Sequence, residues 1–196
     1  MRTRDANKET AIQEQAIEMI VKQGLDGFSM QKLARAAGVS PATLYIYYKD
    51  REDLLLQLCL EISDELFQAS IQDFDPDMHF AEGMRVQWRN RAKFFLEHPI
   101  ELEFIEQIRY SPMNEKIRET LMKKFGAVLG KFVQNAVTRG ELVPLPFEVY
   151  WSVAYAPLYQ LLKFHGQENS YANKKFQITD EIMDQSLQLI LKALKP

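Results

Sequence analysis

A sharp turn expected at Gly38 is the feature that most restricts how this chain of 196 residues can fold. It lies in the segment FSMQKLARAAGVSPATLYIYYKDREDLLLQL. Ser29 is suited to cap a short helix over Met30 to Ala37, which the glycine ends. Ser40 is a natural N-cap for a second short helix, with Pro41 at its first position. Two short helices joined in this way form a helix-turn-helix pattern, although two ordinary core helices joined by a glycine turn share this spacing.

The second short helix and its end carry three tyrosines, and helical geometry divides them between faces. At 3.6 residues per turn, Leu44 and Tyr48 share a face that can pack inward. Thr43 and Tyr47 share a second face, and Tyr45 projects on the flank opposite it. Small side chains let a helix approach a groove closely, and hydroxyl groups can bond phosphates or base edges. We therefore predict that Tyr48 lies in the core and that four residues face outward: Ala42, Thr43, Tyr45 and Tyr47.

The next helix begins with its own capping signal. Asp50 is expected to cap it, with Asp53 three residues on as its partner. Lys49 and Arg51 then lie at the junction between the two helices, where their side chains can reach backbone phosphates.

The rest of the chain is also predicted to be helical. Apolar residues recur at helical spacing, as in the series Phe80, Met84, Trp88, Ala92 and Phe95, and no run alternates with period two. Nine helices are expected in all. One of them covers roughly residues 147–165 and contains Pro157, which should kink it at a cost on the order of 3 kcal/mol.

Composition excludes several other classes of protein. The net charge of −3 argues against a non-specific polycation, while leaving room for a small basic surface. The single cysteine, Cys59, permits no internal disulfide and fits a reducing cytoplasm. Three scattered histidines offer no metal-ligand spacing, so neither a metal nor a cofactor is expected. The apolar runs are too short for a membrane span, and the charged N-terminus does not lead into a secretory signal.

An enzyme is not expected either. Glu97, His98, Glu101 and Glu103 cluster around Pro99, but charged runs of this kind are usually solvated helix faces. They are accompanied neither by a nucleophile motif nor by a phosphate-binding glycine loop.

The segment with the glycine turn, together with the helix before it, resembles the DNA-binding signature of the TetR/AcrR family of bacterial transcription regulators. The resemblance covers roughly residues 8–60. It implies an N-terminal three-helix helix-turn-helix domain over residues 1–53 and a C-terminal helical domain over 54–196, with helix 54–71 connecting the two. The family fold also implies a two-fold homodimer whose last two long helices pair with their mates. The matching residues are Gly24, Phe28, Leu33, Ala34, Gly38, Val39, Ser40, Thr43, Leu44, Tyr45, Tyr48 and Lys49.

The resemblance also implies which residues bind DNA. The positions carried over lie at the start of the first short helix, in the recognition helix and at the junction that follows it. They are Ser29, Met30, Gln31, Ser40, Pro41, Ala42, Thr43, Tyr45, Tyr47, Lys49 and Arg51.

The C-terminal half is expected to bind a mainly apolar or aromatic small molecule beside the Pro157 kink. The candidate ligand-binding residues are aromatics on helical stripes, each of which also has an ordinary core position as its plainer explanation: Trp88, Phe104, Phe125, Trp151, Tyr155 and Tyr159. The expected function is a cytoplasmic, ligand-responsive repressor on a palindromic operator. The alternative is a helical protein-interaction module that lacks sequence-specific DNA binding.

Overall fold

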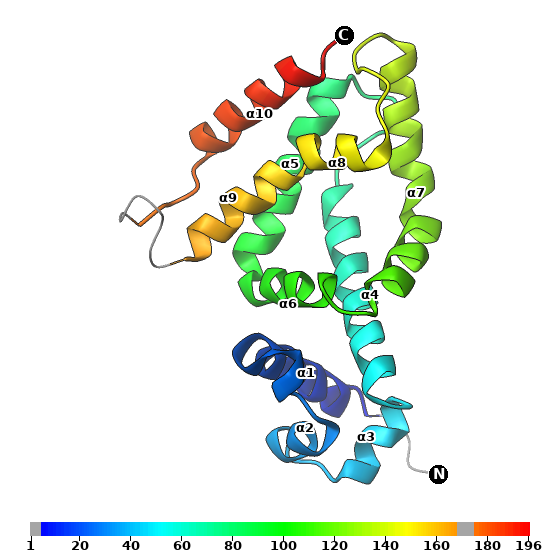
Figure 1. Cartoon of the computed structure of the whole chain (residues 1–196), viewed down its shortest axis with the longest axis vertical. Helices are drawn as coiled ribbons and strands as arrows, with labels where there is room; N and C mark the ends of the chain where they lie inside the picture. Colours follow the sequence, from blue (N-terminus) through cyan, green and yellow to red (C-terminus); the bar gives the residue numbers. More distant parts are fainter. Residues whose placement is uncertain (1–4, 168–174) are drawn as a thin grey trace. The chain divides into compact units, whose positions relative to one another are not determined.

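Helices form all the regular secondary structure in the residues that the computed structural model describes, 5–167 and 175–196 (Figure 1). The all-helical expectation is therefore confirmed. The helices within these residues are α1 (Ala6–Gly27), α2 (Met30–Ala36), α3 (Pro41–Tyr47), α4 (Arg51–Ser70), α5 (Phe80–Glu97), α6 (Pro99–Arg109), α7 (Asn114–Thr138), α8 (Phe147–Ala154), α9 (Ala156–Gly166) and α10 (Asp180–Leu194). None of them has the length and apolar content that crossing a bilayer requires.

Pro157 explains why the described residues hold ten helices where nine were expected. The expected kink is a complete break at Tyr155, between α8 and α9. Proline has no backbone N–H to donate, and its ring obstructs a continuous helix. The N–H of Leu158 donates to Tyr155 O at 3.1 Å instead of to the carbonyl of Ala154. That carbonyl accepts a hydrogen bond from Trp88 Nε1 of α5 at 2.8 Å, so the break joins α5 to the end of α8.

The chain divides into two compact units, each built from separate stretches of sequence. Unit 1 extends to Glu65 and includes His98–Met122, while unit 2 consists of Leu66–Glu97 and Lys123–Pro196. Helices α1, α2, α3 and α6 belong to unit 1, whereas α5, α8, α9 and α10 belong to unit 2. The expected boundary after residue 53 placed 54–65 and 98–122 in the C-terminal domain, whereas here they pack within unit 1.

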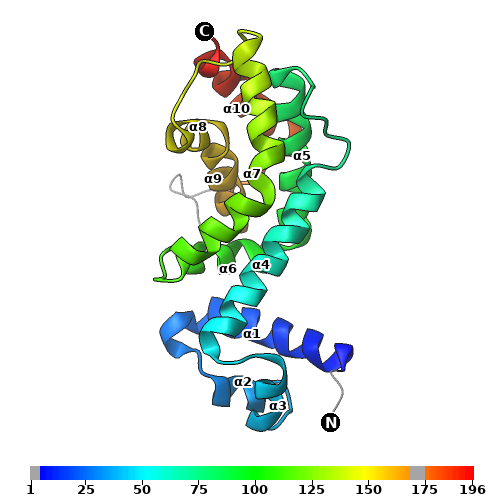
Figure 2. The same cartoon turned by 90° about the vertical axis from the view of Figure 1, so that its right-hand side faces the viewer.

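Packing between α1 and α6 explains the composition of unit 1 (Figure 2). Phe104 and Ile108 of α6 are buried in one hydrophobic core with Ile12 and Ile20 of α1. The side chain of Gln107 also donates from Nε2 to the backbone carbonyl of Val21 at 3.3 Å. The core therefore includes a helix that lies far from the helix-turn-helix in sequence.

Unit 2 is organised on α5. The expected apolar stripe of this helix is buried, and α9 and α10 pack against the helix. Gly83 lies so close to α7 that an added Cβ would come within 2.5 Å of the Phe132 ring. A second stripe at four-residue spacing follows from it, formed by Gly83, Gln87 and Arg91, and all three residues are buried. A buried stripe that contains an amide and a guanidinium needs a chemical explanation.

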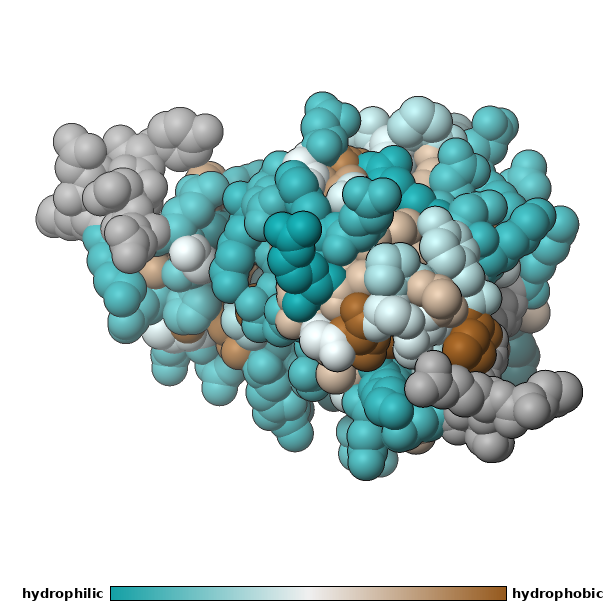
Figure 3. All heavy atoms as spheres, turned by 90° about the horizontal axis from the view of Figure 1, so that it is seen from below, coloured by the Kyte–Doolittle hydropathy of each residue, from teal (hydrophilic) through white to brown (hydrophobic). Residues whose placement is uncertain are grey.

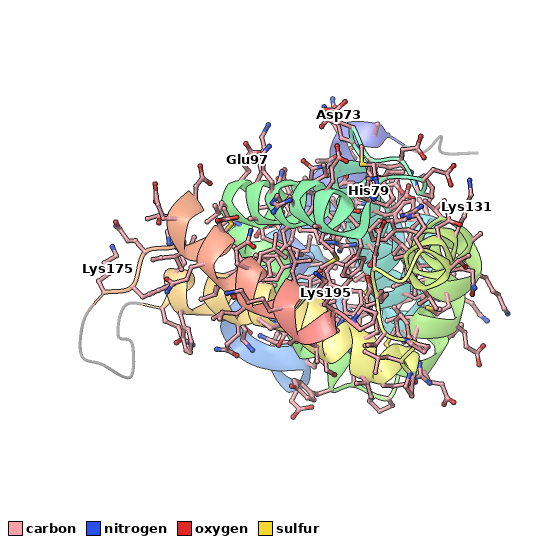
Figure 4. All side chains as sticks on the ribbon, turned by 90° about the horizontal axis from the view of Figure 1, so that it is seen from above. Asp73, His79, Glu97, Lys131, Lys175 and Lys195 are labelled. Carbon is pink, nitrogen blue, oxygen red and sulfur yellow. The ribbon has the colours of Figure 1, made fainter. Side chains whose placement is uncertain are left out.

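The N-terminus of α5 is capped by a carboxylate from beyond the end of α7. Glu141 Oε2 accepts from the backbone N–H of Phe80 at 2.6 Å. Its Oε1 lies 2.6 Å from His79 Nδ1, labelled in Figure 4, and accepts from Arg139 Nε at 3.0 Å. Burial raises the pKa of Glu141, but these three donors lower it more, from 4.5 to about 2.

We expect Glu141→Gln to lower the free energy of unfolding by about 1–2 kcal/mol at neutral pH, because a charged cap becomes a neutral one. The folded state favours the carboxylate, so this stabilisation is fully present above pH 4.5 and is lost as the pH falls towards 2. Urea unfolding curves should therefore converge for the two proteins at acid pH. Glu119→Gln, at an exposed position of α7, is the control. A difference that stays constant down to pH 3 would contradict this account.

Candidate functional site

The helix-turn-helix is held by local hydrogen bonds that match the expected capping residues. Ser29 Oγ accepts from Lys32 N at 3.3 Å, and Ser40 Oγ accepts from Thr43 N at 3.2 Å. At the end of α2 the backbone turns through Gly38, whose φ is +66°. Gly38 N donates to Arg35 O at 3.3 Å, and Val39 N donates to Ala34 O at 2.9 Å. These two hydrogen bonds form the pattern that ends helices at a left-handed glycine.

The start of α4 carries the expected pair of aspartates. Asp53 N donates to Asp50 Oδ1 at 2.8 Å, and Lys49 N donates to Asp53 Oδ2 at 2.8 Å. The hydrogen bond from Lys49 is the main reason that the pKa of Asp53 is lowered. This reciprocal cap fixes the chain direction directly after α3.

The exposed side of α3 presents the small and hydroxyl-bearing side chains that were expected there. Pro41, Ala42 and Tyr45 are exposed, the last with 57% of its surface accessible. Thr43 is half-buried, and its hydroxyl lies 2.8 Å from Ser40 Oγ. Figure 3, seen from below the view of Figure 1, shows hydrophilic side chains around a small area of intermediate and hydrophobic ones.

Tyr47 does not face outward, so that part of the expectation is wrong. Only 4% of its surface is accessible, and its ring lies 6.3 Å from that of Tyr48, which is buried as expected. Its hydroxyl accepts from Asp5 N at 2.9 Å and donates to Asp5 O at 3.3 Å. Leu44, Tyr47 and Tyr48 together form the inward face, because residues three and four apart both lie beside one another on a helix. Tyr47 therefore holds the start of α1.

Two other residues expected to contact DNA make contacts within unit 1 instead. Met30 is buried in the core of unit 1. Arg51 Nη2 donates to Leu25 O at 2.6 Å, and its guanidinium lies 5.8 Å from the centre of the Phe28 ring. The burial of Met30 and the intramolecular contacts of Arg51 therefore compete with the DNA contacts expected of these residues.

Three further residues expected to contact DNA lie at the ends of the helix-turn-helix. Gln31 and Lys49 are exposed, whereas Ser29 is half-buried. Arg35 and Ile46 are also exposed, although neither is among the expected DNA contacts. Arg35 lies one helical turn after Gln31, and that four-residue spacing could have identified it as part of the same face.

Four of the six aromatic residues expected at the ligand site come together in unit 2. Trp151 is 4.8 Å from Tyr155 and 6.1 Å from Tyr159, measured between ring centres. Trp88 joins them through its bond to Ala154 O. The other two lie elsewhere, since Phe125 stacks on Phe67 at 4.0 Å and Phe104 belongs to the core of unit 1. Helical periodicity marks a buried face but does not say which helices meet.

The same cluster contains a buried arginine that is not among the expected ligand-binding residues. Arg91 is only 4% exposed, and its Nη1 donates to Tyr159 Oη at 2.9 Å. Its guanidinium carbon lies 4.9 Å from the Tyr155 ring centre and 5.9 Å from that of Trp151. One turn earlier, Gln87 Oε1 accepts from Tyr155 Oη at 2.8 Å. The four-residue spacing of Gln87 and Arg91 beside the apolar stripe of α5 is the sequence signal that could have identified them.

No carboxylate forms an ion pair with Arg91 in the described part of the chain. None of the ion pairs found there includes it. Burial raises the pKa values of Tyr150 and Tyr155, so their phenols stay neutral. Burial acts to lower the pKa of Arg91 itself, but the phenols of Tyr159 and Tyr155 raise it more, and the side chain remains charged. Arg91 Nε and Gln87 Nε2 are both buried and have no hydrogen-bond partner.

Comparison with known proteins shows what this chain is similar to. Residues 12–58 match the family model of bacterial regulatory proteins, tetR family. A TetR family transcription regulator of known structure from Marinobacter aquaeolei is 30% identical and has a TM-score of 0.84, with the alignment covering 100% of this chain and 99% of that one. An uncharacterised HTH-type transcriptional regulator from Haemophilus influenzae is 34% identical over 95 residues, which are 48% of this chain and 50% of that protein.

A more distant structure shares the fold. The transcriptional regulator FadR from Bacillus subtilis, in complex with stearoyl-CoA, has a TM-score of 0.75 at 17% identity. The alignment covers 95% of this chain and 99% of that one.

Proposed function

This chain belongs to the TetR family of bacterial transcription regulators, and we propose that it is a repressor that a small apolar or aromatic molecule releases from a palindromic operator. Members of this family are DNA-binding regulators and not enzymes. The observation that carries the proposal is the exposed side of α3, presented by the capped turn at Gly38. A helix presented in this way can enter the major groove with Ala42, Thr43 and Tyr45 towards the bases.

The operator is testable by selection from a pool of random duplexes. Because two-fold protein symmetry imposes two-fold symmetry on the site, the recovered sequences should be palindromic, with half-sites about one helical turn apart or a multiple of it. Recovery of asymmetric sequences alone, or of none above background, would contradict the proposal. A repressor should also lower expression from a reporter promoter that contains the selected site.

A homodimer is proposed from the surface of unit 2. Helices α8 and α10 pack against each other, and Phe147, Val149 and Leu189 on them are large exposed apolar side chains. Apolar groups gathered on adjacent helices suit an interface of four helices with a second copy.

We expect sedimentation at micromolar concentration to give the mass of a dimer. Leu189→Glu should produce a monomer, because it buries an unpaired charge at the centre of the interface. The control is Leu96→Glu, since Leu96 is an exposed leucine on α5. A wild-type protein that sediments as a monomer, or a Leu189→Glu variant that stays dimeric, would overturn this assignment.

The aromatic cluster of unit 2 supports the small-molecule part of the proposal. Trp88, Trp151, Tyr155 and Tyr159 supply apolar surface together with a few directed polar groups, which is typical of ligand sites. FadR, which shares this fold, is known in complex with stearoyl-CoA. Helix α4 begins directly after α3 and has its last residues in unit 2. It is therefore the element expected to transmit the effect of ligand binding to the recognition helix α3.

Release by a ligand requires reciprocal coupling. If the ligand weakens DNA binding, the operator must weaken ligand binding by the same factor. The corresponding coupling free energy is on the order of 1–3 kcal/mol in ordinary allostery. Calorimetric titration of a screened ligand, with and without operator, measures that factor. Equal affinities in the two titrations would remove ligand release from the proposed function.

A further inference from the structure

We propose that the effector of this regulator is an anionic amphiphile, whose acidic head group pairs with Arg91 and Gln87 while its apolar body lies against the surrounding aromatic rings. This inference deepens the proposed function and rests on it for the link between the ligand and DNA binding. The head group is a carboxylate or a phosphate, because both present the planar or clustered oxygens that a guanidinium binds.

The first support is the cost of a buried charge without a partner of opposite sign. Arg91 is almost completely enclosed, and the partners it has are neutral: the Tyr159 hydroxyl and two aromatic faces. Contact with aromatic faces offsets only part of the free energy lost when a guanidinium leaves water. A structural arginine in a core is normally paired with a carboxylate, and none is paired with it in the described part of the chain.

The second support is the position of the unused donors. Arg91 Nε and Gln87 Nε2 are buried without a hydrogen-bond partner, and they come from residues one turn apart on the same side of α5. Arg91 Nη1 already donates to Tyr159 Oη, and Gln87 Oε1 already accepts from Tyr155 Oη. Two N–H donors held in this way suit a group with at least two acceptor oxygens, such as a carboxylate or a phosphate.

The third support is the row of aromatic side chains beside Arg91. Trp151 is half-buried and lies between Tyr155 and Phe147, with ring centres 4.8 Å and 6.0 Å from its own. An apolar body can lie along these side chains while the head group remains at Arg91. The aromatic rings then contribute affinity, and the guanidinium selects the charge.

The test uses the full-length protein and amphiphiles matched in their apolar part. Decanoate, decyl phosphate and decanol share one body, while naphthoate and naphthalenemethanol share another. Isothermal titration should show that at least one anion binds about tenfold to a hundredfold more tightly than the alcohol with the same body. Comparison of decanoate with decyl phosphate decides between the two head groups. Equal binding of anion and alcohol, or no binding of any anion, overturns the proposal.

Variants separate a binding role of Arg91 from a structural one. Arg91→Met should abolish the preference for the anion and leave the affinity for the alcohol within about twofold, because the apolar walls stay in place. Arg91→Lys should restore part of the preference, since it returns the charge without the planar fork. The control is Arg89→Met, at an exposed position of the same helix, which should behave as the wild type. If Arg91→Met lowers the melting temperature but keeps the preference for the anion, Arg91 is structural and the proposal fails.

A DNA-binding measurement keeps this inference distinct from the proposed function. Fluorescence anisotropy of a labelled operator is recorded with and without the anion that binds best. Tight, Arg91-dependent binding without any change in operator affinity would retain the anion site and remove ligand release. Release of the operator that persists in Arg91→Met would retain the repressor and remove the anion site.

Discussion

Replacing Tyr47 by alanine is expected to lower the free energy of unfolding by about 3 kcal/mol, because it leaves a cavity where a buried ring was. Its ring packs beside Tyr48 in the core of unit 1, and its hydroxyl bonds both backbone groups of Asp5 at the start of α1. Tyr47→Phe should cost only about 1 kcal/mol, since it keeps the ring and loses the two hydrogen bonds. Chemical denaturation followed by circular dichroism measures both.

The neighbouring tyrosine of the same helix is the control. Tyr45 is 57% exposed, so Tyr45→Ala should change the free energy of unfolding by no more than about 0.5 kcal/mol. The opposite result, with Tyr45→Ala unstable and Tyr47→Ala as stable as the wild type, would reverse the assignment of the two tyrosines to the surface and the core.

The double variant Thr43→Ala/Tyr45→Ala is expected to lose about 2–6 kcal/mol of binding free energy for the selected operator, because each base-edge contact is worth about 1–3 kcal/mol. Thr43 and Tyr45 are close neighbours, so the sum is an upper estimate. Binding to a scrambled duplex should change little, since that binding depends on phosphates. Anisotropy titrations with both duplexes give the two affinities.

Two further variants show whether the loss belongs to base contacts. Lys49→Ala should weaken binding to all duplexes alike and reduce the salt slope by about one, as expected for one lost phosphate contact. Tyr110→Ala removes a tyrosine that is 83% exposed at the end of α6, and it should bind the operator like the wild type. Equal losses on operator and scrambled duplex for the double variant would remove Thr43 and Tyr45 from sequence recognition.

Local chemistry made the helix-turn-helix predictable. Ser29, Ser40 and Asp50 each accept a hydrogen bond within their own helix start, and Gly38 alone supplies the left-handed turn. These interactions lie within a few residues of sequence and need no knowledge of the tertiary fold. Tyr47 was misassigned because a helix of seven residues has an ambiguous inward face, which was decided by the distant Asp5.

Tertiary packing decided what the sequence could not show in the C-terminal half. Phe104 and Trp88 have the same periodic signal, yet one packs on α1 in unit 1 and the other on α8 in unit 2. Pro157 indicated the position of the kink correctly, but not that the Ala154 carbonyl freed at the break accepts a hydrogen bond from Trp88. Arg91 was missed because a charged residue in a helix is usually solvated, and only its enclosure makes it significant.

The tryptophan that bonds the break between α8 and α9 belongs to a pair that gives the protein an internal fluorescent probe. The sequence has two tryptophans, Trp88 and Trp151, and both belong to unit 2. The indole of Trp88 is bonded at the break itself, while that of Trp151 lies near the Arg91 cation. Intrinsic tryptophan emission therefore reports on unit 2 alone, whereas unit 1 contributes tyrosine emission only. If the two units unfold at different temperatures, emission excited where tryptophan alone absorbs follows the unfolding of unit 2 without any added dye.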